Sequence, residues 1–132
     1  MDFLPPDLTL DPRIVADTKV EQSDAKLKAL AGDWSHEDVA REVGYMILHG
    51  RDWAQTRTIA KNPQEHSELN PILGEHPSTG KVNNYFLATG LGHIALAHVL
   101  GSDWRKYFQY GTIGLEAVVT QRNKQRGIGM TF

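Results

Sequence analysis

The residues best suited to chemistry in this chain are polar side chains that interrupt apolar, helix-like segments. Where several share a segment they are three, four or seven residues apart, which places them on one face of a helix. If the segments pack together, these groups meet in one buried polar cluster: His49, Asp52, Gln55, Thr56, His93, Glu116 and Asn123. The spacing thus predicts a polar site inside a helical protein.

Such a cluster suits two kinds of role. A buried carboxylate is costly unless it is paired, so we expect a satisfied hydrogen-bond network that fixes how the helices pack. The alternatives are a catalytic or ion-relay site, and simple surface exposure of these side chains. Glu116 is the only charged residue between Tyr107 and Gln121. We predict that it is mostly buried and hydrogen-bonded to a group from the first or second helix, with Gln55 and His93 as the favoured partners.

The chain has six histidines and no cysteine, which raises the question of a metal site. No two histidines have the spacing of four that puts two imidazoles on one helical face, and His93 and His98 lie about 140° apart around a helix. No metal and no cofactor is therefore predicted. The competing hypothesis is a small metal-dependent hydrolase built on His49, Asp52, His93 and Glu116. The full set of possible ligands is His49, Asp52, His66, Glu68, His76, His93, His98 and Glu116.

The stretch GEHPSTGKV, residues 74–82, superficially resembles a phosphate-binding loop. A phosphate loop has four residues between its first glycine and the Gly-Lys pair, then Ser or Thr, whereas here five residues intervene and Val82 follows. The glycines Gly90 and Gly92 lie inside a helical pattern and follow no strand, so they are not a dinucleotide fingerprint either. We predict a loop leading into a helix and no nucleotide.

The pattern of apolar residues and helix caps predicts an all-α fold with three main helices, near 36–61, 79–100 and 103–126. Ser35 and Asp38 form a variant of the capping box, and Asn62-Pro63 ends the first helix. Ser102-Asp103 is expected to cap the third helix and Gly127 to end it. The short connection between the second and third helices predicts a C-terminal helical hairpin.

The first 34 residues differ in composition from the rest. They contain six aspartates, three prolines and only scattered apolar residues. This predicts an extended N-terminal arm, 1–34, with one short helix from Ser23 to Gly32, ahead of a helical domain, 35–132. An arm so poor in apolar residues is expected to lie on its own domain or on a partner. The N-terminus lacks the pattern of a secretory signal peptide.

Two features of the later helices suit close packing or a membrane. Residues 82–102 contain no Asp, Glu, Lys or Arg over 21 positions, the length needed to cross a bilayer. Small residues form stripes that favour close approach of helices. These residues are Ala88, Gly92 and Ala95 on the second helix and Gly111 and Gly114 on the third. A formal net charge of −2 gives no sign of nucleic-acid binding.

Three motifs together resemble a family of small, hydrophobic, helical proteins encoded by phages and bacteria and often associated with membranes. The motifs are DWAQT at 52–56, ELNPILGEHP at 68–77 and NYF at 84–86, followed by His93, Glu116 and Asn123. The resemblance covers residues 38–132. It implies no established chemistry, so it transfers no catalytic residue.

The leading hypothesis from the sequence is a non-enzymatic structural protein. The polar arm, the uncharged helix and the small-residue stripes favour a homo-oligomer or a larger protein assembly that also meets a membrane. With the resemblance, this implies a phage virion component, located in the virion or at the host cell membrane. The mean hydropathy of −0.41 favours a chain that stays soluble within its assembly.

Overall fold

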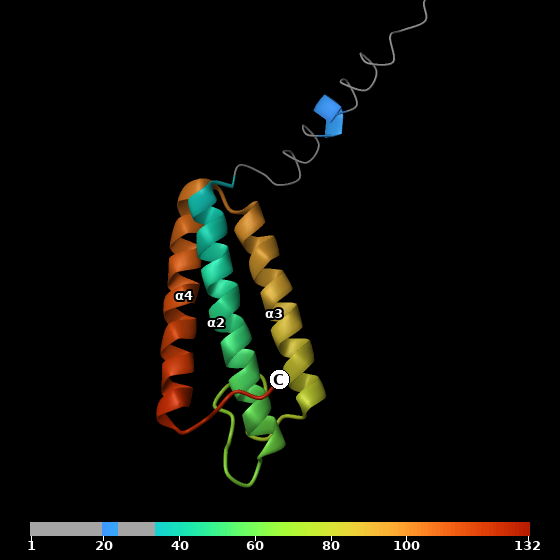
Figure 1. Cartoon of the computed structure of the whole chain (residues 1–132), viewed down its shortest axis with the longest axis vertical. Coiled ribbons are helices and arrows are strands. Elements are labelled where there is room, and N and C mark those ends of the chain that lie inside the picture. The colour runs from blue at the N-terminus through green and yellow to red at the C-terminus, as the bar shows by residue number, and fades with distance from the viewer. Residues whose placement is uncertain (1–19, 24–33) are drawn as a thin grey trace, which may run out of the picture. The chain divides into compact units, whose positions relative to one another are not determined.

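The computed structural model describes residues 20–23 and 34–132, and these residues form helices and loops without a strand (Figure 1). The protein is all-α, as predicted. The chain divides into two units, Met1–Asp33 and Trp34–Phe132. In the first unit, residues 20–23 form one helical turn. The short helix predicted from Ser23 to Gly32, and most of the predicted arm, lie outside the described residues.

The second unit contains three long helices, α2 (His36–Lys61), α3 (Thr79–Val99) and α4 (Ser102–Gln125). Each predicted boundary agrees with the structure to within one residue. Leu100 and Gly101 connect α3 to α4, which form the predicted hairpin. α2 lies between the other two helices and packs against both, whereas α3 and α4 contact each other much less (Figure 1). The polar residues gather where α2 faces α4, and His93 joins them from α3.

Local sequence signals set the helix ends. The Ser35 hydroxyl accepts a hydrogen bond from the Asp38 amide at 3.1 Å, and the Asp38 carboxylate accepts one from the Ser35 amide at 2.9 Å, which confirms the capping box. α4 differs from the prediction, because Gly101 is its cap and Ser102 is already its first helical residue. Gly127 has a φ of +75° and ends α4 as predicted, with the Ile128 amide bonded to the Asn123 carbonyl at 3.0 Å.

The loop between α2 and α3 holds the GEHPSTGKV stretch, and its polar groups are used within the chain. Ser78 caps α3 by accepting from the Lys81 amide at 3.2 Å. The Lys81 ammonium donates to the Leu73 carbonyl at 2.8 Å. Asn70 begins a turn, because its carbonyl accepts from the amides of Leu73 and Gly74. The predicted loop leading into a helix is therefore present.

The apolar core is small and sits where this loop meets the helices. Leu73 from the loop packs with Val82 and Phe86 from α3, and Trp53, Ala60 and Tyr85 border them. The C-terminal residues cross α2 at the same end, where the Thr131 amide donates to the Ala54 carbonyl at 3.0 Å. The loop and tail thus close one end of the space between the helices.

The predicted small-residue stripes do not lie between helices of this chain. Ala88, Gly92 and Ala95 on α3, and Gly111 and Gly114 on α4, are exposed. A side chain added at Gly92, Gly111 or Gly114 would meet nothing within 4 Å. Gly90 faces the interior instead, where an added Cβ would lie 3.5 Å from the His49 ring. The described residues contain no helix that is both long enough and apolar enough to span a membrane.

Candidate functional site

The buried face of α2 is a seam of polar and aromatic residues. Positions 38, 42, 45, 49, 52 and 56 follow the alternating spacing of four and three that normally carries the apolar contacts between packed helices. Asp38, Glu42, Tyr45, His49 and Thr56 are buried there, and Asp52 is partly buried. α4 has a matching seam of polar residues at 105, 109, 112, 116, 120 and 123. The interior therefore depends on hydrogen bonds more than on apolar packing.

One network joins the start of α2 to the start of α4 and the end of α3. Arg105 is 2% exposed, and its guanidinium donates to the Asp38 carboxylate at 3.2 Å. It also donates to the carbonyls of Ala97 and Leu100 at 2.8 and 2.9 Å. Burial opposes ionisation of Asp38, but the hydrogen bonds from Ser35, Arg41 and Arg105 outweigh it and lower the pKa of this carboxyl.

Glu42 and His93 form a second pair in the middle of the bundle. His93 Nδ1 lies 2.8 Å from a Glu42 oxygen, and the other Glu42 oxygen accepts from the Gln109 amide at 2.9 Å. His93 Nε2 lies 2.8 Å from the Thr112 hydroxyl, which is also within hydrogen-bond distance of the Phe108 carbonyl. This pair ties all three helices together.

A stack of aromatic rings connects the His93 pair to the lower half of the bundle. The Tyr45 ring lies 3.5 Å from the His93 ring and 5.2 Å from the His49 ring, measured between centroids. Burial and the charges of Glu116 and Glu42 raise the pKa of Tyr45 above its usual value, so its hydroxyl keeps its proton. Tyr45 thus separates two histidine–carboxylate pairs.

His49 and Glu116 form the lower pair. His49 Nδ1 lies 2.7 Å from a Glu116 oxygen, and His49 Nε2 lies 3.0 Å from the Phe86 carbonyl. Both ring nitrogens face acceptors, so the ring is best satisfied when both are protonated. Burial alone would lower the pKa of His49, but these two contacts and the nearby carboxylate charges raise it above 6.5. These contacts therefore favour the protonated form of His49 beside Glu116.

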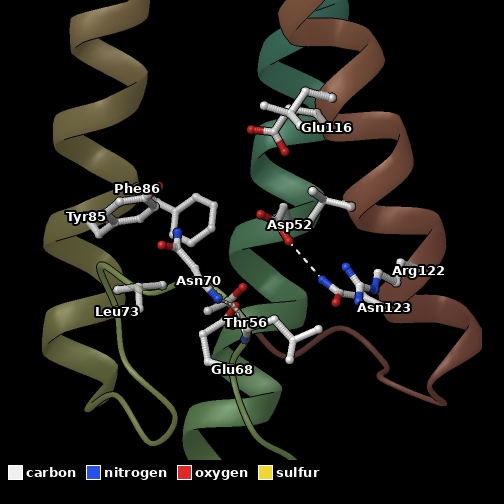
Figure 2. A pocket seen from close by; sticks show the side chains of 13 residues that line it. Asp52, Thr56, Glu68, Asn70, Leu73, Tyr85, Phe86, Glu116, Arg122 and Asn123 are labelled. Atoms are coloured by element: carbon white, nitrogen blue, oxygen red, sulfur yellow. Dashed lines mark hydrogen bonds between the residues drawn. The ribbon is translucent and has the colours of Figure 1, made fainter.

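Asp52 lies one turn below His49. One of its oxygens accepts a hydrogen bond from the Asn123 amide at 3.0 Å (Figure 2). Burial raises the pKa of Asp52 to about 7, with contributions from the negative charges of Glu116 and Glu68. Asp52 is thus the carboxyl in this region whose charge changes near neutral pH.

This shift predicts that stability depends on pH through Asp52. A carboxyl whose pKa is raised on folding gives full stability below its unfolded pKa of about 4, and this stability is lost as pH rises to about 7. Asp52→Asn keeps the acceptor for Asn123 without the charge, so we expect it to be more stable than the wild type at pH 8, by at most about 4 kcal/mol. Urea unfolding at pH 4.5 and pH 8 measures this.

The matched control is Glu65→Gln, in the exposed part of the loop between α2 and α3. Its stability should follow that of the wild type at both pH values. If Asp52→Asn gives the wild-type pH dependence as well, the carboxyl of Asp52 is not held in an unfavourable environment.

Asp52 and Glu116 border a pocket between α2, α3, α4 and the loop, of about 290 Å³. We call it the acidic pocket, because three carboxylates line it, from Asp52, Glu68 and Glu116. Its walls also include one cation, Arg122, the polar residues Thr56, Asn70 and Asn123, and the rings of Tyr85 and Phe86 (Figure 2). A smaller pocket shares Asp52, Tyr85, Phe86, Leu115 and Glu116 and extends the same groove toward Thr89 and Thr112.

The predicted polar cluster is present in part as one site and in part divided. Asp52, Thr56, Glu116 and Asn123 line the acidic pocket, and His49 binds Glu116. Gln55 is buried, but its amide donates to the Thr120 carbonyl at 3.3 Å. Glu116 has 14% of its side chain exposed, as expected of a mostly buried residue. Its partner comes from the first long helix, as predicted, but it is His49 and neither of the two favoured residues, Gln55 and His93.

The four residues of the alternative hydrolase do not converge. His93 is bonded to Glu42 and Thr112, apart from the pair formed by His49 and Glu116. Within residues 20–23 and 34–132, no three His, Asp or Glu side chains are placed to hold a metal ion. Of the other possible ligands, Glu68 lines the acidic pocket, His66 is partly buried, and His76 and His98 are exposed.

Sequence reasoning missed several buried residues of the networks. Glu42, Tyr45, Arg105 and Gln109 were not among the predicted site residues, and Asp38 was predicted only as a cap. The alternating spacing of four and three from 38 to 56 was the signal that would have found those on α2.

Comparisons of the chain with protein-family models, with curated proteins and with solved structures find no match. The resemblance carried by the three motifs therefore stays a prediction.

Proposed function

We propose that this chain is a non-enzymatic structural protein that assembles with further copies of itself through the outer faces of its helices. The observation that carries the proposal is that polar side chains are buried inside the helical domain, while large apolar side chains are exposed on its surface. Arg105 and Gln109 are almost completely buried, whereas Ile47, Leu87 and Val118 are each more than 60% exposed. Large exposed apolar surfaces mark sites of association.

All three helices contribute to this outer apolar surface. The exposed side chains include Val39, Val43, Met46 and Ile47 on α2, Leu87, Leu91, Ile94, Leu96 and Val99 on α3, and Trp104, Tyr107, Tyr110, Leu115 and Val118 on α4. Burying one such side chain stabilises an assembly by about 1.5–3 kcal/mol. A partner that covered even one of these faces would therefore gain considerable stability.

The glycines on the outside favour helices of other copies as the partner. Gly111 and Gly114 lie on the exposed side of α4, near Leu115 and Val118, with open space where a side chain would be. Small residues let two helix backbones approach closely, which increases the van der Waals contact between them. The resemblance to phage-encoded proteins supports a virion or the host cell membrane as the setting of this assembly.

The proposal predicts the state of the purified chain in solution. We expect light scattering coupled to size-exclusion chromatography to give the mass of an oligomer, at least twice the 14.8 kDa of one chain. Val118→Lys places a charge on the exposed face of α4 and should shift the chain toward the monomer. Glu65→Lys, in the exposed loop, is the matched control and should leave the mass unchanged.

Two results would contradict this proposal. One is a stable monomer at all concentrations that does not float with phospholipid vesicles. The other is a monomer that does bind vesicles, since lipid would then cover the apolar surface in place of other copies.

A further inference from the structure

The acidic pocket contains buried acceptors that the described part of the chain leaves unused. The Oε2 atoms of Glu68 and Glu116 are buried and have no hydrogen-bond partner among the described residues. Their Oε1 atoms are occupied, by the amides of Leu69 and Asn70 and by His49 respectively. A buried carboxylate oxygen without a donor is unfavourable, so the pocket lacks a donor.

Thr56 gives an independent indication at the floor of the same pocket. Its side chain is 2% exposed, yet its hydroxyl makes no hydrogen bond within the described residues. Thr89, Thr112 and Thr120 behave differently, because each donates to the carbonyl four residues earlier in its own helix. The Thr56 hydroxyl is therefore free to bind a group inside the pocket.

The missing donor should be cationic and larger than a metal ion. Two of the free groups are carboxylate oxygens, from Glu68 and Glu116. The Glu116 carboxylate already has His49 as a partner, whereas the Glu68 carboxylate is bonded to backbone amides. The described residues place no three ligands around a metal. A volume of about 290 Å³ lies at the small end of ligand pockets, and the rings of Tyr85 and Phe86 offer an apolar wall.

We propose that the acidic pocket binds a small organic amine in its protonated form. The ammonium group would donate to the free oxygen of Glu68 and to the Thr56 hydroxyl, below Asp52 in the pocket (Figure 2). The short alkyl part would lie against Phe86 and Tyr85. Such a ligand supplies donors for the buried acceptors that are left without a partner, and its binding requires no association of the chain with other copies.

The test is a titration of the full chain with n-butylammonium chloride at pH 8, followed by ¹H–¹⁵N NMR. We expect saturable shifts of the amides of Thr56, Asn70 and Asn123. The neutral n-butanol, which has the same alkyl chain, should give no saturable shift. Binding should weaken at pH 5.5, where Asp52 carries its proton and the pocket is less negative.

Two variants separate binding from folding. Thr56→Val keeps the shape and removes a hydroxyl that has no partner, so the fold should be unaffected while the amine binds several-fold more weakly. Glu68→Gln keeps an oxygen for the amides of Leu69 and Asn70 and removes the charge, and we expect about tenfold weaker binding. Glu65→Gln is the exposed control and should bind as the wild type does.

Three results would overturn the proposal. The amine and n-butanol could give the same shifts, which would show binding to apolar surface alone. The two pocket variants could bind the amine as the wild type does, which would place the site elsewhere. Magnesium or calcium chloride could give saturable shifts at the pocket where the amine gives none, which would identify a metal site.

Discussion

Replacing Arg105 by alanine is expected to destabilise the helical domain strongly, because this residue joins α4 to both other helices. The guanidinium bonds the Ala97 and Leu100 carbonyls at the end of α3, which have no partner within that helix, and the Asp38 carboxylate at the start of α2. Removing one partner of a buried charged contact costs about 3–5 kcal/mol. This is a large share of the 5–15 kcal/mol typical of a whole domain.

Thermal unfolding followed by circular dichroism measures this effect. For a domain of this size, we expect Arg105→Ala to lower Tm by more than about 10 °C. The matched control is Lys106→Ala, one residue along the same helix, where the side chain is exposed and lies over the Tyr107 ring. If the two substitutions lowered Tm equally, the helix ends would not depend on Arg105.

Arg105 also illustrates how much of the fold was readable from the sequence. Helix ends depend on local signals, such as the Ser35 and Asp38 box and Gly127, and these were predicted to within one residue. Which face of each helix is buried depends on contacts between helices. On α2 the apolar residues Val39, Val43 and Ile47 are exposed, and the polar seam is buried. The usual preference for apolar interiors therefore misleads in this chain.

The candidate site was predictable in its membership but not in its pairing. His49, Asp52, Glu116 and Asn123 were recognised because polar residues are unusual inside helical segments. Which of them meet depends on the relative rotation and shift of α2 and α4, and helical spacing within one segment carries no information about this. For the same reason Gln55 and His93 were the favoured partners of Glu116, while the structure pairs His93 with Glu42 and Glu116 with His49.

The contribution of loop residues was harder still to predict. Glu68 was considered only as a possible metal ligand, and its role as a wall of the acidic pocket depends on the turn at Asn70. The Glu68 carboxylate bonds the amides of Leu69 and Asn70, and these bonds hold it at the wall of the acidic pocket. Such local capping by an acidic side chain has no periodic signal in the sequence.

Glu116→Ala is expected to have the second large effect, through the charge it leaves behind. The His49 ring is 6% exposed, and Glu116 is the carboxylate bonded to it, at 2.7 Å. Without Glu116 the buried His49 ring loses its carboxylate partner and keeps only neutral ones, the Phe86 carbonyl and the hydroxyls of Tyr45 and Thr89, which should cost about 3–5 kcal/mol. Glu37→Ala is the control, because the Glu37 side chain is 86% exposed and lies 3.6 Å from Arg41, so its removal should hardly change stability.

The dependence of this loss on pH distinguishes the ion pair from simple packing. Because the pKa of His49 is raised on folding, the stability from the pair is fully present below about pH 6.5 and is lost as pH rises through the folded pKa. Removing Glu116 also relieves the repulsion that raises the pKa of Asp52, which favours the variant at high pH. Urea unfolding should therefore show a larger difference in the free energy of unfolding between wild type and Glu116→Ala at pH 5.5 than at pH 9. A gap of the same size at both values would mean that Glu116 contributes through its shape and contacts, and that His49 is not held as a cation.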